Sequence, residues 1–542
     1  MASRVGSSTI ATPARVARNS AGLLVARLTS LLAAFLTLPI LYDRLGAPAF
    51  GVWALLSGLI AWVAYADLGL GSAQIREVAR AVGSGRHRQA RAVLGVGVIW
   101  GASLGTLALA GCWLCWPWIA ALLNLGSMSG PARDATLLLL VGFWVATGTV
   151  PWRAVLEGTQ RYLLLSMVEI AAAVLTAGLT ILVLLSGGGL VALAAATTAV
   201  NACRAIAIVA MASLLTRELT PSIVRIRRSD LRVALRYGLP VQVSNAAAAV
   251  NNDTDRLMLG AVIGPTAVAG FEPGSKLANL LRLPPSFLMT AVFPAAASAA
   301  AGDPRRLDRL YVTMTRYLAA FAALGVAVLV VSADPLIRLW LGQPLPLAST
   351  TVVVLGVGYA INVTVGAASV VTRAEGAPGR ETRYALVAAA LNIVLTLPLL
   401  HLLGAWGAPL STTIAASVAS GYFFVHFHRR SGRSFRPLTR ALFPPTLAAA
   451  VAVGLTSAAV PLLPDGTGRG DAFLAVASRS GMALVLTTAV LVALRYFDTH
   501  DLARLRAALA APADRRPVAP AAGPRRPESP LEPTSRLERS SR

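Results

Sequence analysis

Long apolar runs separated by short polar segments fill most of the 542-residue chain. A bilayer core about 30 Å thick needs about 20 apolar residues per helix, and runs of that length predict about fourteen membrane-spanning helices. Twelve of them form two sets of six, near residues 20–41, 49–70, 92–117, 135–151, 163–186 and 190–214, and near 238–263, 268–298, 313–333, 348–371, 384–403 and 407–427. A final pair is expected near 441–463 and 473–496. We therefore expect an all-α integral membrane protein.

The two sets of six spans repeat one another. Gly46-Ala-Pro-Ala-Phe-Gly51 opens one apolar run, and Gly264-Pro-Thr-Ala-Val-Ala-Gly270 opens another 218 residues later (264 − 46). Glu157-Gly158 returns as Glu375-Gly376 at the same offset. Because an even number of spans separates the copies, both have the same orientation, and the repeat is parallel. Such a repeat predicts two similar helix bundles with a site between them, as in secondary transporters.

The composition excludes an ordinary soluble protein. Hydrophobic residues make up 56% of the chain and charged residues 13%, with a mean hydropathy of +0.66, whereas soluble proteins carry about 25% charged residues. The net charge of +24 does not indicate nucleic acid, because the arginines fall between the apolar runs and not along one face. Most lie in alternate loops, so the positive-inside rule predicts that these loops and both termini are cytoplasmic. With Lys276 as the only lysine, the arginine bias favours a bacterial cytoplasmic membrane.

These patterns predict six consecutive segments. They are a cytoplasmic N-terminal segment (1–19), a first six-helix lobe (20–214), a basic cytoplasmic linker (215–237), a second six-helix lobe (238–427), helices 13 and 14 (428–496), and a disordered cytoplasmic tail (497–542). The tail is rich in Ala, Pro, Arg and Ser and has too little apolar surface to fold.

The chain shows no pattern typical of a metal or redox site. Cys112-Trp-Leu-Cys115 has the spacing of a redox motif, but it lies inside an apolar run, as does Cys203. We expect no metal and no cofactor.

Several short motifs resemble the Wzx-type polysaccharide flippases, members of the superfamily that also contains lipid II flippases and multidrug exporters. The resemblance extends from about residue 20 to about residue 430. The motifs are Phe50-Gly51-Val-Trp53, Asp67-Leu-Gly-Leu-Gly71, Asp255-Arg-Leu-Met-Leu-Gly260, Pro294-Ala-Ala-Ala-Ser298 and Leu339-Trp340-Leu341-Gly342. The chain departs from this family at Phe271, where a tyrosine is common.

The resemblance implies two six-helix lobes in a V, with helices 13 and 14 added; in lipid II flippases the equivalent pair borders a groove for the lipid tail. It also implies a transporter and not an enzyme. Its substrate would be a polyprenyl-pyrophosphate-linked oligosaccharide, flipped to the outer leaflet by alternating access. The expected partners are this lipid-linked glycan, membrane lipids, a polysaccharide polymerase and glycosyltransferases.

Cations at membrane depth are the first candidate site residues, because each costs roughly 2.5 to 3.5 kcal/mol at a helix centre unless a partner or a cavity compensates it. The candidates for a cationic cavity that binds phosphate are Arg282, Arg204, Arg27, Arg256 and Lys276. Arg282 is the foremost, since Pro284 and Pro285 break the helix directly after it. Arg27 could instead reach the membrane surface, and Lys276 could form a helix-surface pair with Glu272.

Acidic residues and boundary charges are candidates for coupling or gating. Those within spans are Asp253, Asp255, Glu272 and Glu169; those at cytoplasmic boundaries are Glu157, Arg161, Glu375 and Arg383. The boundary charges recur in both repeats, so they could close a gate by pairing between the lobes, or could simply be solvated. Glu169 could serve packing, and Asp255 and Arg256 could neutralise each other.

Four other functions remain open from the sequence. A lipid II flippase is the closest alternative. A multidrug or organic-cation exporter of the same fold would favour an anionic cavity. A membrane glycosyltransferase or glycan ligase would need acidic residues in outside loops or a long outside loop, and neither is apparent. A scaffold without transport would gain nothing from charges at membrane depth.

Overall fold

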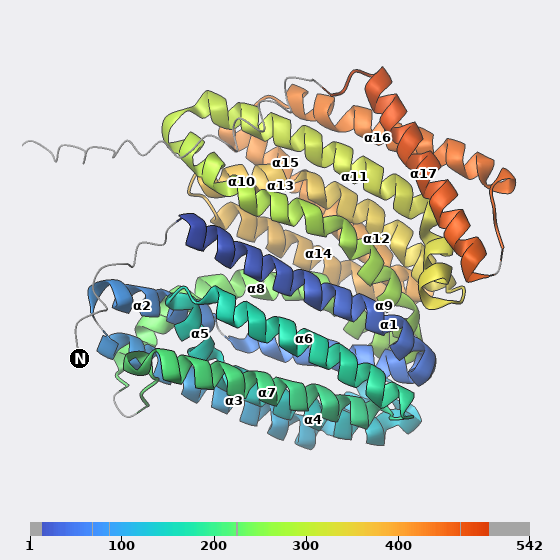
Figure 1. Ribbon diagram of the computed structural model, residues 1–542. Coiled ribbons are helices and arrows are strands. Elements are labelled where there is room, and N and C mark those ends of the chain that lie inside the picture. The colour runs from blue at the N-terminus through green and yellow to red at the C-terminus, as the bar shows by residue number, and fades with distance from the viewer. Residues whose placement is uncertain (1–12, 68, 86, 224–225, 467, 498–542) are drawn as a thin grey trace, which may run out of the picture. The chain divides into compact units, whose positions relative to one another are not determined.

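The computed structural model describes residues 13–497 except 68, 86, 224–225 and 467. The predicted tail and most of the predicted N-terminal segment therefore lie outside the described residues. Throughout the described residues the regular elements are helices (Figure 1). The all-α class is confirmed.

The helices are as follows. The first half contains α1 (Pro13–Ala64), α2 (Leu70–Ser84), α3 (His87–Leu122), α4 (Ser129–Gly148), α5 (Val150–Gly158), α6 (Tyr162–Leu185) and α7 (Leu190–Leu215). The second half contains α8 (Arg228–Val262), α9 (Pro265–Asn279), α10 (Leu283–Gly302), α11 (Pro304–Leu341), α12 (Pro346–Thr364), α13 (Gly366–Ala374), α14 (Gly379–Leu403) and α15 (Gly407–Ser431). After the repeat come α16 (Arg436–Ala459) and α17 (Arg469–Ala493).

Eleven helical segments of the described residues are long and apolar enough to cross a membrane. Two of them, Arg18–Asp67 and Gly379–Ser431, each contain two of the predicted spans. Helix α8 covers a further predicted span but is not among the eleven, because Asn, Asp and Arg side chains interrupt its apolar surface between residues 245 and 256. The chain is a multi-pass membrane protein, while the number fourteen stays a prediction.

Glycine and proline set the turns between these helices. Gly46 has a φ of 74° inside α1, a conformation that a residue with a Cβ rarely adopts, and the kink there separates the first two predicted spans. Gly264 has a φ of 116° just before α9. The break predicted at Pro284 is also present, because a 3-10 turn, η4 (Leu280–Arg282), precedes α10. A similar turn, η1 (Tyr65–Asp67), precedes α2.

Helix α1 joins the two halves. It packs against α6 of the first half and against α9 of the second, and Figure 1 shows it running between the two sets of helices. The approach to α9 is close enough to require glycine, since a Cβ on Gly51 would lie 1.9 Å from the Pro265 carbonyl oxygen. Helix α8 likewise packs against both α2 and α14. The boundaries of two six-helix lobes stay a prediction.

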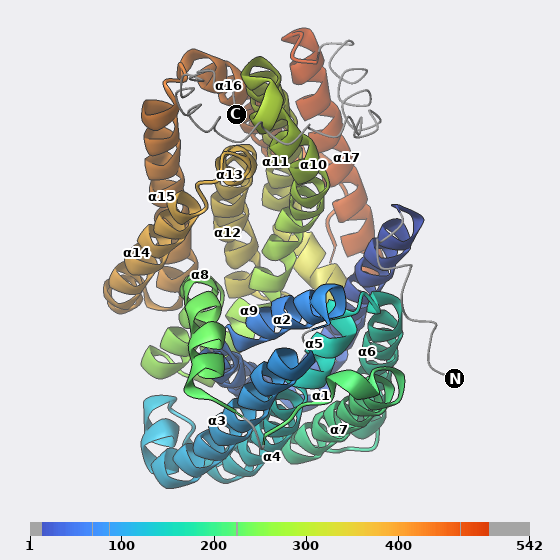
Figure 2. The same ribbon diagram turned by 90° about the vertical axis from the view of Figure 1, so that its left-hand side faces the viewer.

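Helices α16 and α17 pack against α11 and against each other, as Figure 2 shows from the side. They bury Ala327 and Val331 of α11, which share an apolar cluster with Ala449 of α16 and Ala483 of α17. This added pair therefore makes α11 an interior helix.

Candidate functional site

Four charged side chains of α5, α6 and α7 form one network. The Arg153 guanidinium contacts Glu157 (Nε to Oε1, 2.8 Å) and Glu169 (Nη1 to Oε1, 2.6 Å). The other oxygen of Glu169 lies 3.4 Å from Nη1 of Arg204. Arg204, a candidate for the cationic cavity, is thus held between α6 and α7 by a carboxylate. Its charge is neutralised within the first half.

A second network joins α8 and α9. Arg256 is paired with Asp253 and, at 3.4 Å, with Glu272. Lys276 lies 3.3 Å from the same Glu272 oxygen, so the helix-surface pair expected from the sequence is present. Arg256 also donates to the Ala54 carbonyl on α1 (3.3 Å). Two acids and two cations balance here, and Arg256 pairs with Asp253 and Glu272 and not with Asp255.

Asp255 lies in a pocket of neutral donors. The residue is 5% exposed, and its carboxylate accepts hydrogen bonds from side chains of α14 and α15, namely Asn392 (3.0 Å), Thr396 (3.4 Å) and Thr412. Ser411 and Thr396 share a further hydrogen bond of 2.9 Å. Among the described residues no Lys or Arg lies within ion-pair distance of Asp255. A buried carboxylate among hydroxyl and amide oxygens can take up a proton or a small cation.

Sequence reasoning missed the four side chains around Asp255. The available signal was the spacing of Asn392 and Thr396, one helical turn apart in an apolar run, followed by Ser411-Thr412 in the next. Neutral polar residues are common in membrane helices, so this signal alone did not single them out. No cluster of three or more His, Cys, Asp or Glu suited to a metal ion occurs in the described part of the chain.

Arg282 and Arg27 contact aromatic rings instead of carboxylates. The Cζ atom of Arg282 lies 4.8 Å from the centre of the Tyr359 ring on α12, and its Nη1 lies 3.5 Å from the Asn279 side-chain oxygen. Arg27 on α1 lies 5.7 Å from the Phe287 ring on α10. No described carboxylate is within 4.0 Å of either guanidinium. Both positive charges remain available to an anion.

The boundary charges do not pair between the two repeats in this conformation. Glu157 pairs with Arg153, as above, and Arg161 donates to the Leu215 carbonyl (3.3 Å). Glu375 pairs with Arg433 (3.0 Å) and, more loosely, with Arg380 (3.9 Å). Among the described residues, the ion pairs near this boundary do not include Arg383. The predicted gate is therefore not closed by these residues here.

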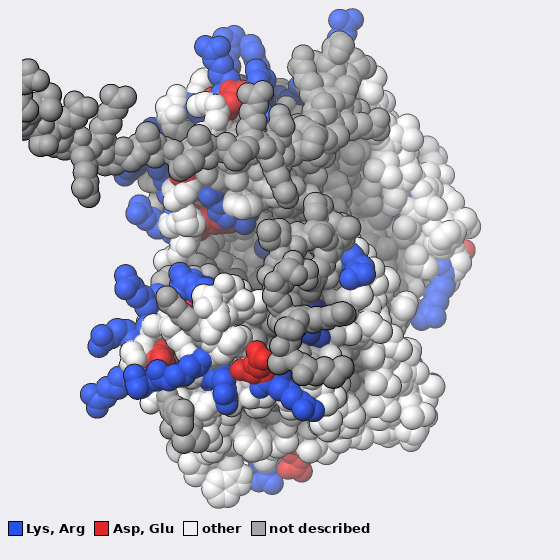
Figure 3. All heavy atoms as spheres, turned by 60° about the vertical axis from the view of Figure 1, so that its left-hand side comes forward, with Lys and Arg blue, Asp and Glu red and all other residues white. Residues whose placement is uncertain are grey.

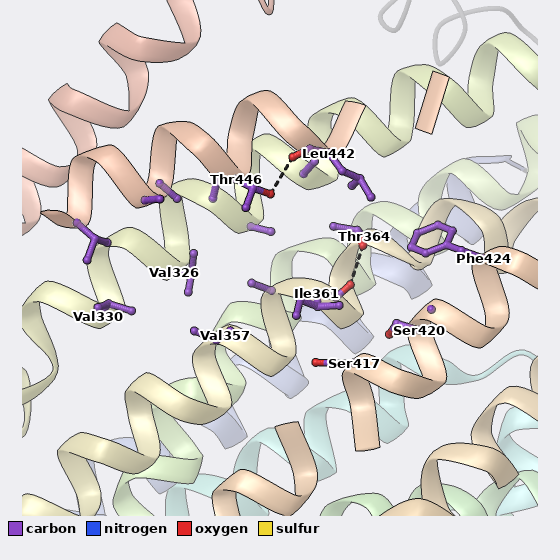
Figure 4. Close-up of a pocket in the computed structure, with 18 residues that line it drawn as sticks. Val326, Val330, Val357, Ile361, Thr364, Ser417, Ser420, Phe424, Leu442 and Thr446 are labelled. Atoms are coloured by element: carbon purple, nitrogen blue, oxygen red, sulfur yellow. Dashed lines mark hydrogen bonds between the residues drawn. The ribbon is translucent and has the colours of Figure 1, made fainter. Parts of the chain in front are cut away.

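An apolar cavity lies between α11, α12, α15 and α16 (Figure 4). Its volume is about 540 Å³, within the range of ligand pockets. Small and branched apolar side chains dominate its wall, among them Val326, Val330, Val357, Ile361, Phe424, Leu442 and Val453. The hydroxyls of Thr364 and Thr446 are bonded to the Ile361 and Leu442 carbonyls at 2.6 and 2.8 Å. The wall thus suits a hydrocarbon.

Positive charge is unevenly distributed over the visible face of the molecule. In the view of Figure 3 the Lys and Arg side chains lie mainly toward the left, and mostly uncharged atoms lie toward the right. A helix broken at depth with an unneutralised cation, Arg282, beside the break is typical of membrane transporters.

The chain belongs to the family described as "Polysaccharide biosynthesis protein", whose model matches residues 16–299, more than half of the sequence. A second family model, described as "MatE", matches residues 240–397. The curated proteins include none that matches this chain.

Solved structures show the same fold at low identity. The lipid II flippase MurJ in an inward closed conformation is 13% identical with a TM-score of 0.67, covering 88% of this chain and 99% of that one. An inward-facing multidrug resistance MATE transporter is 17% identical with a TM-score of 0.64, covering 75% and 97%. A MOP superfamily transporter from Pyrococcus furiosus is 17% identical with a TM-score of 0.55, covering 77% and 95%. These are transporters and a flippase, and not enzymes.

Proposed function

We propose that the protein flips a polyprenyl-pyrophosphate-linked oligosaccharide from the cytoplasmic to the outer leaflet of a bacterial cytoplasmic membrane, with both termini in the cytoplasm. The sugar chain and the pyrophosphate cannot cross hydrocarbon, whereas the polyprenyl tail can remain in it. A protein for this task needs a free cation for the phosphates and an apolar wall for the lipid. Rocking of two repeats would expose the head group to each side in turn.

The observation that carries this proposal is the environment of Arg282. It lies at a helix break, on the Tyr359 ring, and no described carboxylate neutralises it. Guanidinium binds phosphate oxygens in a bidentate manner. Arg27 on the Phe287 ring would add a second free cation. The weaker candidates are Arg204, Arg256 and Lys276, because each of these cations already forms an ion pair with a carboxylate.

The apolar cavity beside α16 supports a lipid-linked substrate, since its wall offers hydrocarbon contact within the membrane region. Asp255 would serve coupling, by binding a proton or a small cation in one conformation. The substrate of this family would be supplied by glycosyltransferases and consumed by a polymerase, which we propose as functional partners.

Two rivals differ in the charge that they require. A lipid II flippase would use the same free arginines, so only the substrate assay separates the two. An organic-cation exporter would use an anionic site, and Asp255 is the residue that could provide it. The Pyrococcus furiosus transporter is described as having a binding pocket of reverse polarity, which favours pocket charge as the feature that separates functions within this fold.

The test is flipping of a fluorescent lipid-linked oligosaccharide in proteoliposomes. We expect Arg282→Ala to lower the initial rate at least about tenfold and Arg282→Lys to lower it less. The control is Arg133→Ala, whose side chain is 50% exposed beside Asp134 and should leave the rate unchanged. An unchanged rate in Arg282→Ala, at equal amounts of folded protein, would reject Arg282 as the phosphate site. Export of an organic cation that depends on Asp255, with no flipping of any lipid, would favour the exporter.

A further inference from the structure

A tryptophan of the second half binds a backbone carbonyl of the first. The indole nitrogen of Trp340, in the last turn of α11, donates to the Phe35 carbonyl oxygen on α1 at 3.0 Å. The two rings also stack, with centroids 4.3 Å apart and planes 12° from parallel. A hydrogen bond and a ring stack therefore join the same two residues.

The Phe35 carbonyl is available because of Pro39. In an α-helix the carbonyl of residue 35 accepts from the N–H of residue 39. Proline has no N–H, so it leaves that carbonyl without its intrahelical donor. In a membrane a helix carbonyl without a donor is costly. The Trp340 indole replaces the missing donor.

The contact between Phe35 and Trp340 connects the two halves of the molecule. The first part of α1 is anchored to the first half, where Asn19 on α1 donates to the Gln160 carbonyl (3.2 Å). Close to Pro39, Leu38 and Tyr42 pack with Ile337 and Leu341 of α11 in one apolar cluster. If the halves rock about each other, the contact between Phe35 and Trp340 is among those that must break.

We propose that Trp340 and the carbonyl freed by Pro39 form a latch that favours the conformation in which α1 and α11 touch. The latch opens when the halves separate at this end, where water then satisfies both groups. The bond is directional and is lost when the two groups separate, so it selects one state more sharply than apolar packing alone. It concerns how the transporter changes conformation and does not depend on which substrate is moved.

Two substitutions test the latch from its two sides. Trp340→Phe removes the donor and keeps an aromatic ring, while Pro39→Ala supplies an N–H that bonds the Phe35 carbonyl within α1. Spin labels at Ser186→Cys, after α6, and Gln343→Cys, after α11, would report the separation of the halves, in a background with Cys112, Cys115 and Cys203 replaced. Both label sites are exposed. Each substitution should raise the ratio of long to short distances by roughly threefold or more.

The double variant decides between a latch and general loosening. If Trp340 acts only through the carbonyl that Pro39 frees, Trp340→Phe combined with Pro39→Ala shifts the distances no further than the stronger single change. The controls are Trp144→Phe, which removes an indole bond to the Ala102 carbonyl inside the first half (3.1 Å), and Pro48→Ala, which lies after the Gly46 kink. Unchanged distances in Trp340→Phe, equal shifts in the controls, or fully additive shifts in the double variant would each overturn the proposal.

Discussion

The two halves of the chain have similar helix breaks but carry opposite charges at them. The 3-10 turn η1 (Tyr65–Asp67) and the turn η4 (Leu280–Arg282) lie 215 residues apart (280 − 65), and each precedes a helix of its repeat. The first turn ends in an acid and the second in an arginine. The two halves thus have a helix break at positions 215 residues apart, and the charge at the end of the break has the opposite sign.

The same contrast holds for the charges deeper in each half. In the first half Glu169 lies between Arg153 and Arg204 and neutralises them. In the second half Asp255 has only neutral donors, and Arg282 faces a ring. A paired charge stabilises helix packing, whereas a charge without a counterion remains ready to bind one. We therefore expect substitution of the paired Glu169 to affect stability, and substitution of Asp255 or Arg282 to affect transport.

The largest effect should come from Asp255→Asn. Asparagine keeps the size of the side chain but cannot take up a proton or hold a cation by charge. We expect the rate of gradient-driven flipping in proteoliposomes to fall at least about tenfold, equivalent to about 1.4 kcal/mol in the barrier, and the dependence on an imposed proton or sodium gradient to disappear. The amount of folded protein should not fall, because a buried charge is removed. A variant that still responds to the gradient would exclude Asp255 as the coupling residue.

Glu169→Gln is the matching change in the first half. It leaves Arg204 without its counterion, while Arg153 keeps Glu157. Breaking a fully buried pair costs about 3 to 5 kcal/mol, but 30% of the Arg204 side chain and 21% of the Glu169 side chain are exposed, so we expect a loss nearer 1 kcal/mol. A lower thermal midpoint in detergent, with flipping per folded molecule unchanged, is the expected result.

A double variant sharpens this prediction. Arg204→Ala with Glu169→Gln removes both members of the pair and should restore part of the lost stability. If the double variant instead lowers flipping per folded molecule as far as Asp255→Asn does, the paired charges of the first half also serve transport. The proposed contrast with Asp255 would then be wrong.

The sequence predicted the helices and their breaks better than it predicted which charged side chains are paired. Apolar length predicted helical segments long enough to cross a membrane, and Pro284-Pro285 predicted the break after Arg282, because these are local properties of the chain. The pairing of Arg204 with Glu169 depends on which faces of α6 and α7 meet, and local sequence does not determine this. The donors around Asp255 come from residues more than 130 positions away. Such a site requires the packing of three helices to be known.

The smallest effect concerns the pair of helices that has no counterpart in the first half. On α3 Trp113 is 64% exposed, whereas on α11 Val331, 218 positions later, is 7% exposed, because it packs in one apolar cluster with Ala449 of α16 and Ala483 of α17. Asp465 lies in the loop between α16 and α17. Its carboxylate forms ion pairs with Arg338 on α11 and with Arg479 on α17, each at 3.1 Å, and so connects these two helices. Removing this carboxylate should weaken the attachment of the added pair without altering either repeat.

The pH dependence of Asp465→Asn gives a specific signature of this tie. Desolvation acts to raise the pKa of Asp465, but the hydrogen bond from Arg338 and the positive charge of Arg479 outweigh it and hold the pKa below its usual value. A carboxyl group with a lowered pKa stabilises the fold above its unfolded pKa of about 3.9 and loses that contribution as the pH falls through the folded value. Since 47% of the side chain is exposed, we expect less than about 1 kcal/mol. The thermal midpoint of Asp465→Asn should therefore lie slightly below that of the native protein at pH 7, and the two should converge as the pH falls below about 4. A difference that persists in acid would assign the effect of the substitution to packing and not to charge.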